Sequence, residues 1–202
     1  MPEAVENYKS IHRAEIENAE AKLRMMQREK NPENDFSENP LHLSELQANN
    51  QYEKNGYVYR TDESGRTKHI SGELKLEKGV RNRVIQQEVR ELGVDGDEGG
   101  HIIGVQFDGP PDAYNLFPQN AELNKGKWSE SAWANMEREW VEALKFGKKV
   151  DISVDMRYEG HSKRPAEIDV NYHISDGRKI EIIFRNQARN QIKYHSGIQL
   201  KE

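Results

Sequence analysis

Cysteine is absent from this sequence, and so is any long apolar run. Without cysteine the fold can use neither disulfides nor thiolate metal ligands. This fits a cytosolic protein, and it fits equally a protein that is threaded unfolded through a secretion machine. No apolar run approaches the roughly 20 residues that a membrane-spanning helix needs. The first residues, MPEAVENYKS, also lack the basic and then apolar order of a signal peptide. We therefore expect no membrane span, no membrane partner and no cleavable signal peptide.

An excess of positive charge is missing as well. The net charge is −5, and residues 1–50 carry ten acids and six bases, net −4, which leaves −1 for residues 51–202. This balance argues against a protein that coats nucleic acid, but it leaves room for a catalyst with a small local basic surface. Hydrophobic residues make up 34% and charged residues 32%. The apolar residues cluster in periodic runs, which predicts a globular domain with a modest core.

The N-terminal quarter differs in texture from the rest. Residues 3–30 contain no glycine or proline and show apolar residues at near-helical spacing, which predicts one amphipathic helix. The stretch NPENDFSENP (31–40) then predicts a linker. Ser44 is a candidate cap for a short helix over Leu43–Asn50. We expect residues 1–50 to form an N-terminal helix and linker, and residues 51–202 to form the functional domain.

The rest of the chain combines β and α patterns. GYVYRTDESGRTKHISGELKL (56–76) predicts a β-hairpin with its turn at DESG. VRNRVIQQEVREL (80–92) predicts a short helix, and SESAWANMEREWVEALKFG (129–147) predicts a longer one that Gly147 closes. Alternating apolar residues in 148–158, 167–174 and 179–184, with a tight turn at SDGR, predict an antiparallel sheet with one solvated face.

His101 stands between Gly99–Gly100 and Ile102–Ile103. A lone histidine is more often structural than catalytic. The two glycines favour a site, because they permit unusual backbone geometry and let a substrate approach closely. The pair Ile102–Ile103 predicts a buried strand, with the imidazole held at its edge. An ordinary imidazole titrates near ~6.5 and can therefore accept a proton at neutral pH.

Asparagines dominate the following stretch, YNLFPQNAELNKGKW (114–128), which we place between a strand and a helix. Taken singly, Asn115, Asn120 and Asn124 are ordinary loop and cap residues. Together with Gln119 and Glu137 they supply oxygen ligands with little negative charge, which suits Mg²⁺. Zinc is disfavoured, because the histidines show no HxxxH or HxH pairing. A histidine base beside an oxygen-ligated cation is what metal-assisted phosphodiester hydrolysis requires.

In this order, DEGGH, YNLFPQNAELNKGKW and WANMEREW resemble the DNA/RNA non-specific endonuclease family, which belongs to the ββα-metal (His-Me finger) nucleases. The resemblance covers roughly residues 57–184, is densest over 97–144, and points to the bacterial secreted toxin-domain branch. It implies an α+β fold, in which a ββα-metal core joins a mostly antiparallel sheet and carries an N-terminal helical appendage.

The resemblance assigns the general base to His101 and the metal-ligating asparagine to Asn124. The resemblance also assigns Asn115 as the supporting asparagine. This residue helps to position the site and belongs, with His101 and Glu137, to the catalytic residues that the resemblance implies. The helical glutamate that holds metal-bound water falls on Glu137, with Glu139 as the alternative because SESAW looks inserted after Trp128. The implied cofactor is Mg²⁺, with Mn²⁺ as a substitute.

The motif also departs from the family pattern. Many members read Asp-Arg-Gly-His where this chain reads Asp-Glu-Gly-Gly-His, so the arginine that would contact phosphate is missing. We expect Asp97 to order the turn and Gly99 and Gly100 to be structural at the site. The candidates for phosphate binding are Arg81, Arg83 and Arg138, although a surface charge is the commoner role for any one of them.

The expected function is Mg²⁺-dependent, sequence-non-specific cleavage of DNA, with RNA as a further substrate, through contacts to the backbone. No base-reading pattern accompanies the site. We expect a toxin domain used in competition between bacteria, delivered without a cleavable signal peptide, active in the target cytoplasm and matched by an immunity protein. Two alternatives remain open: an inactive module on the same fold that binds nucleic acid or protein, and a housekeeping secreted nuclease.

Overall fold

The computed structural model describes residues 40–125 and 131–199. Pro40–Glu202 makes up one compact unit. The expected N-terminal helix (3–30) and nearly all of the linker lie outside the described residues, so the division of the chain near residue 50 stays a prediction. Within the described part, no helix combines the length and the hydropathy that crossing a membrane would require.

A seven-stranded antiparallel sheet forms the body of this unit, in the order β1-β2-β3-β6-β7-β8-β9. Its strands are β1 (Gln51–Lys54), β2 (Tyr57–Thr61), β3 (Thr67–Glu73), β6 (Val150–Tyr158), β7 (Pro165–Ile174), β8 (Arg178–Arg185) and β9 (Ile192–Gln199). The expected hairpin and the three alternating strands are confirmed. Along β6 the apolar residues from Val150 to Met156 are buried, while Asp151, Ser153 and Asp155 are partly or fully exposed. This alternation gives the sheet its one solvated face.

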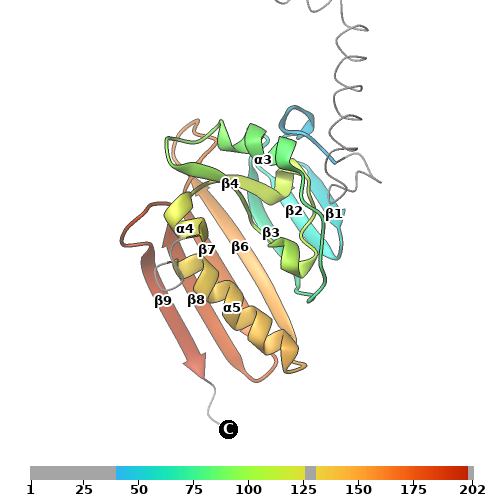
Figure 1. Ribbon diagram of the computed structural model, residues 1–202, viewed down its shortest axis with the longest axis vertical. Helices are drawn as coiled ribbons and strands as arrows, with labels where there is room; N and C mark the ends of the chain where they lie inside the picture. The colour runs from blue at the N-terminus through green and yellow to red at the C-terminus, as the bar shows by residue number, and fades with distance from the viewer. Residues whose placement is uncertain (1–39, 126–130, 200–202) are drawn as a thin grey trace, which may run out of the picture. The chain divides into compact units, whose positions relative to one another are not determined.

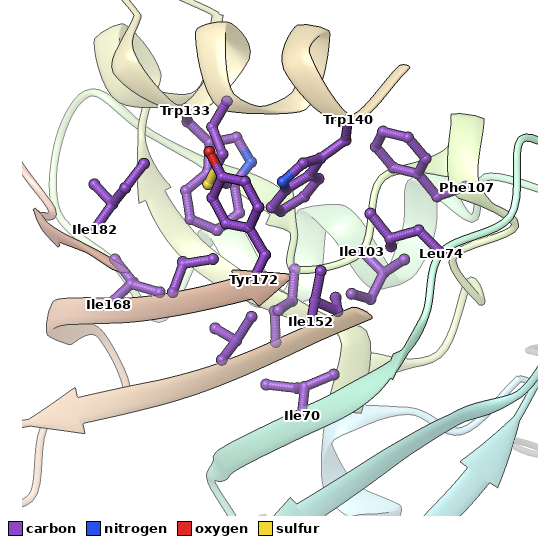
Figure 2. Packing of buried hydrophobic residues seen from close by; sticks show 14 of the residues in the cluster. Ile70, Leu74, Ile103, Phe107, Trp133, Trp140, Ile152, Ile168, Tyr172 and Ile182 are labelled. Atoms are coloured by element: carbon purple, nitrogen blue, oxygen red, sulfur yellow. The ribbon is translucent and has the colours of Figure 1, made fainter. Parts of the chain in front are cut away.

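Helix α5 (Ala132–Lys145) lies across the apolar face of β6, β7 and β8, as Figure 1 shows. Ser131 caps its start by accepting a hydrogen bond from the Ala134 N–H, and Gly147 follows its end with a φ of +71°. Trp133 and Trp140 point from this helix into the core (Figure 2), and both are almost fully buried. The Trp140 ring meets the Tyr172 ring edge-on with centroids 5.5 Å apart. These contacts anchor the helix, and with it Glu137, on the sheet.

A separate two-stranded ribbon, β4 (Asp97–His101) and β5 (Leu116–Asn120), is followed by the short helix α4 (Ala121–Lys125). Helix α3 (Arg83–Arg90) packs against this ribbon through its buried residues Ile85 and Val89. Three 3₁₀ turns, η1 (Leu43–Glu45), η2 (Val105–Phe107) and η3 (Ala113–Asn115), complete the described elements. The expected α+β class, a ββα unit beside a mostly antiparallel sheet, is confirmed.

Three expectations about local structure were wrong. The strand at this site is DEGGH, which ends at His101, whereas Ile102 and Ile103 form a buried turn. Within the asparagine-rich stretch, Leu116–Asn120 is strand β5 and Ala121–Lys125 is helix α4 rather than loop. The helix expected over Leu43–Asn50 is only the turn η1, whose capping interaction comes from Glu45 accepting the His42 N–H. In the first two cases, the pairing of β4 with β5 outweighs the local pattern.

Candidate functional site

Gly99 and Gly100 in β4 allow close packing on both sides of the strand. A Cβ on Gly99 would lie 2.1 Å from the backbone oxygen of Gln86 in α3. The Gln86 side chain also donates to the Gly99 carbonyl at 2.9 Å. A Cβ on Gly100 would lie 2.0 Å from Oε1 of Gln119 in the facing strand. These glycines therefore let α3 and Gln119 approach the strand. Gly99 also lines the cleft described below, and the expectation that the pair opens space for substrate stays a prediction.

Gln119 and Asn120 are not cation ligands in this arrangement. The Gln119 side chain is fully buried and does not line the cleft described below, and neither of its amide atoms has a hydrogen-bond partner among residues 40–125 and 131–199. The Asn120 side chain instead accepts the Glu122 N–H at the start of α4. Of the amide side chains suggested as ligands, Asn124 alone lines the cleft formed by the described residues.

Asp97 is a buried anchor at the start of β4. Its carboxylate accepts two hydrogen bonds from Arg164, at 2.6 and 3.0 Å, and one from the Val94 N–H at 3.0 Å. The bidentate pair ties β4 to the start of β7, and the contact with Val94 orders the preceding turn. The expected structural role of Asp97 in the turn matches these contacts.

His101 ends β4 and lies at the wall of a cleft. Its side chain is almost completely buried, and Nε2 has no hydrogen-bond partner within the described residues. Burial, followed by the positive charge of Arg81, lowers the pKa of His101 from 6.5 to about 4. The imidazole is therefore neutral at pH 7 and able to accept a proton.

Glu137 faces the same cleft from α5. A Cβ on Gly104 would lie 2.7 Å from its Oε1, so glycine at this position makes room for the carboxyl group. Burial raises the pKa of Glu137 from 4.5 to about 7, against the opposing effects of hydrogen bonds from Gln106 and Trp133 and the charge of Arg81. The carboxyl group can therefore exchange a proton near neutral pH.

Glu139, the alternative to Glu137, points elsewhere. Its carboxylate accepts the Tyr172 hydroxyl at 2.6 Å and pairs with Arg178, both on the main sheet. It does not line the cleft. The helical repeat explains the difference, because residues two positions apart on a helix face different directions. The geometry favours Glu137 over Glu139 for a role in the cleft.

Asn115 is fully buried and uses its whole side-chain amide to hold the turn after His101. Its Oδ1 accepts the Ile103 N–H at 2.9 Å and the Tyr59 hydroxyl at 3.2 Å. Its Nδ2 donates to the carbonyls of Ile103 and Pro110 at 3.0 and 2.8 Å. Every hydrogen-bonding position of this amide is occupied and Asn115 does not line the cleft, so its contacts suit a residue that helps to position the site.

Asn124, in α4, lines the cleft beside Glu98 of β4. Its Nδ2 donates to Glu98 Oε2 at 2.7 Å, and Lys125 Nζ lies 2.9 Å from Glu98 Oε1. Glu98, which follows Asp97 where many family motifs have arginine, is thus hydrogen-bonded to the asparagine that the motif marks as a metal ligand.

The cleft that joins these residues has a volume of about 610 Å³. Its walls come from α3, β4, the turn at η2, α4 and α5. Arg81 and Arg83 line it as expected, whereas Arg138 does not and instead hydrogen-bonds Asn135 on its own helix. Arg90 also lines it, on the same face of α3 as Arg83 and about two helical turns farther along. Although the chain is acidic overall, several positively charged side chains thus line one concave surface.

The donor set fits a hard cation held mainly by water. Within residues 40–125 and 131–196, no group of three or more His, Cys, Asp or Glu side chains is arranged to hold a metal. Among the oxygen-bearing side chains that line the cleft are the amide of Asn124 and the carboxyl groups of Glu98 and Glu137. Mg²⁺ keeps several waters and needs only one or two protein oxygens, so this sparse set is compatible with it.

Arg90, Gln106 and Glu98 are among the cleft residues to which the sequence patterns gave no role. The seven-residue spacing from Arg83 to Arg90 on a predicted helix is a signal that could have identified Arg90. Gln106 and Glu98 could not be found in this way, because their partners lie 31 and 26 positions away in Glu137 and Asn124.

Comparisons with known proteins agree with this geometry. Residues 48–176 match the sequence model of the family described as DNA/RNA non-specific endonuclease. The type VII secretion system protein EssD of Staphylococcus aureus, in strains USA300 and NCTC 8325, is 37% identical over 147 residues. That match covers 71% of this chain but only 24% of the relative's length.

Solved structures of NucA from Streptococcus agalactiae share the fold. The form with a magnesium ion bound has a TM-score of 0.52 and 14% sequence identity, and the match covers 75% of this chain and 83% of that one. The form with no metal bound has a TM-score of 0.50 and 14% identity, and the match covers 71% and 78% of the two chains.

Proposed function

Because the chain belongs to the DNA/RNA non-specific endonuclease family, we propose that it hydrolyses phosphodiester bonds in DNA, and in RNA as a further substrate, without reading the base sequence. The observation that supports this most directly is the meeting of His101, Glu137 and Asn124 in one cleft with Arg81. These groups come from β4, α5, α4 and the segment before α3.

His101 is the proposed general base. Its pKa of about 4 leaves it neutral at pH 7. It takes a proton from water as the water oxygen forms a bond to phosphorus. The bond from phosphorus to the 3′ oxygen then breaks, leaving a 5′-phosphate and, once the 3′ oxygen has gained a proton, a 3′-hydroxyl. Glu137 orients the water that supplies this proton, and its pKa of about 7 suits a group that exchanges protons near neutrality.

Asn124 is the proposed ligand of one Mg²⁺, for which Mn²⁺ can substitute. When bound, the cation would offset the negative charge that develops on the phosphate oxygens. An amide ligand leaves the positive charge of the cation undiminished, whereas a carboxylate would partly cancel it. Glu137 is the second oxygen group assigned to this metal site.

Arg81 and Arg83, with Arg90 added by the structure, are the proposed phosphate clamp in place of the arginine absent from the motif. The charge of Arg81 lowers the pKa of both His101 and Glu137. Arg81 also lines the cleft, and both observations support a role for it beside the proposed reacting centre. Arg83 and Arg90 lie farther along α3, where they would follow the nucleic-acid backbone. Binding should therefore weaken steeply as the salt concentration rises.

Plasmid degradation tests the proposal. We expect cleavage with MgCl₂, none with EDTA, and a loss of at least about a hundredfold in His101→Ala. Asn124→Ala should cut slowly and need more Mg²⁺. His161→Ala, which removes an exposed histidine outside the cleft, is the matched control and should cut like the parent. A His101→Ala protein as active as the parent would refute the assignment, and an inactive parent that still binds DNA would favour a binding module.

The similarity to EssD supports a role beyond the reaction itself. We propose that the chain is the nuclease part of a protein that is exported by a type VII secretion system and is toxic in the cytoplasm of a target bacterium. A cognate immunity protein would then cover the cleft. Expression in a bacterial cytoplasm should kill, His101→Ala should not, and co-expression of the neighbouring gene should restore growth. Growth with the active protein alone would favour a housekeeping nuclease.

A further inference from the structure

Glu98 and Asn124 form a cross-element pair inside the cleft. Glu98 comes from β4 and Asn124 from α4, 26 positions later, and the distance from Glu98 Oε2 to Asn124 Nδ2 is 2.7 Å. An ionised carboxylate only accepts hydrogen bonds, so the group of Asn124 that faces it has to be the NH₂. The chemistry of the pair therefore fixes which way the amide is turned.

This orientation matters because the two ends of an amide behave differently toward a cation. The carbonyl oxygen can ligate Mg²⁺, whereas the NH₂ group carries hydrogens and cannot. Rotation of the Asn124 amide by half a turn would exchange the two ends and place the oxygen against the Glu98 carboxylate. Glu98 opposes that rotation, so the oxygen is kept on the side away from Glu98.

The second oxygen of Glu98 is held as well. Its Oε1 lies 2.9 Å from Lys125 Nζ. The lysine side chain is 67% exposed and that of Glu98 is 32% exposed, so this ion pair by itself adds little stability. The ion pair orients the Glu98 carboxylate, whose other oxygen accepts from Asn124, and Lys125 balances the charge of Glu98 beside the cleft.

We propose that Glu98 is a positioning residue for the metal site: by holding the NH₂ of Asn124, it presents the amide oxygen of Asn124 to a divalent cation. This inference rests on the proposed role of Asn124 as a metal ligand. It gives the glutamate that replaces the motif arginine a role in cation binding rather than in phosphate binding. Groups that orient metal ligands in this way commonly change metal affinity by about 10- to 100-fold when removed.

Metal binding without nucleic acid tests this directly. The full chain is prepared in a His101→Ala background, and the rise in its melting temperature is followed across a MgCl₂ series at constant ionic strength. Glu98→Ala should weaken Mg²⁺ binding by about tenfold or more. Glu98→Gln, whose amide oxygen can still accept from Asn124, should bind within about threefold of the background. Glu122→Ala is the matched control, because it removes an exposed carboxylate from α4, the helix that also carries Asn124. It should leave Mg²⁺ binding unchanged.

The outcomes separate this inference from the proposed function. If Asn124→Ala binds Mg²⁺ as well as the background does, the proposed ligand itself is wrong. If Asn124→Ala loses affinity but Glu98→Ala does not, the positioning role of Glu98 fails while the metal site stands. If Glu98→Gln binds as poorly as Glu98→Ala, the carboxylate acts through its charge or as a direct ligand, and the inference is overturned. Melting curves without metal show that each variant is folded.

Discussion

The amide of Asn115 offers the sharpest test of how the site is held together. Asn115→Ala removes all four of its hydrogen bonds and leaves the Ile103 N–H, the Ile103 carbonyl and the Pro110 carbonyl without their partner. Ile103 and Pro110 are both buried, so water does not readily replace the lost hydrogen bonds. The turn that follows His101 then loses the side-chain hydrogen bonds from Asn115 that hold it.

The size of the effect follows from these contacts. A buried backbone group left unsatisfied costs about 1–3 kcal/mol. Three such groups, with some relaxation of the turn, predict that the free energy of unfolding falls by about 3–5 kcal/mol. The matched change is Tyr59→Phe, which removes only the 3.2 Å hydrogen bond from the tyrosine hydroxyl to Asn115 Oδ1. It should cost about 0.5–1.5 kcal/mol.

Urea unfolding of the metal-free protein measures both changes, and nuclease activity is followed on the same samples below the onset of unfolding. Because Asn115 acts through the backbone, we expect activity and stability to fall together in Asn115→Ala and to change little in Tyr59→Phe. A variant that keeps its stability to within about 1 kcal/mol yet loses turnover would refute this reasoning. Asn115 would then act on the substrate directly.

Three further predictions concern charge and packing. In metal-free protein, the pKa of His101 is lowered from 6.5 to about 4, so the unfolded chain binds a proton more readily and stability falls as pH drops below 6.5. The pKa of Glu137 is raised from 4.5 to about 7, so the folded protein binds a proton more readily and stability falls as pH rises above 4.5. As pH falls from neutral to about 4.5, the free energy of unfolding of His101→Ala should therefore rise by about 3 kcal/mol relative to the parent, and that of Glu137→Gln should fall by about 3 kcal/mol relative to the parent. Urea unfolding at each pH measures both changes. Equal pH slopes in all three proteins would contradict these shifts. Gly99→Ala should lower the melting temperature and activity together, since its Cβ would lie 2.1 Å from a backbone oxygen of α3; an unchanged melting temperature would contradict the close approach. Arg164→Ala should cost about 3–5 kcal/mol in urea unfolding by leaving a buried carboxylate unpaired, and Asp97→Asn added to it should recover part of the loss; no recovery would place the cost elsewhere.

Local patterns were sufficient to predict the strands and helices that bury one face. The alternation in β6, β7 and β8 and the helical spacing in α5 each follow from a single packed face. The edge strands β1 and β9 escaped prediction because an edge strand buries little. In β9, for example, Ile192 and Tyr194 are 45% and 46% exposed. Such strands are defined by pairing with a neighbour, which local periodicity does not record.

The chemistry of the cleft divides in the same way. Residue type and order in the sequence were enough to mark His101, Asn124 and Glu137 as candidates, because proton transfer and cation binding demand particular side chains. Their pKa values and partners depend on which distant groups the fold brings near, and these came only with the tertiary structure. It placed Arg81 near both His101 and Glu137, turned Glu139 away to the sheet, buried Asn115 beneath the turn and set Glu98 against Asn124. Burial and hydrogen bonding are properties of contacts between segments far apart in the chain, so the sequence determines which groups are available and the fold decides how each is used.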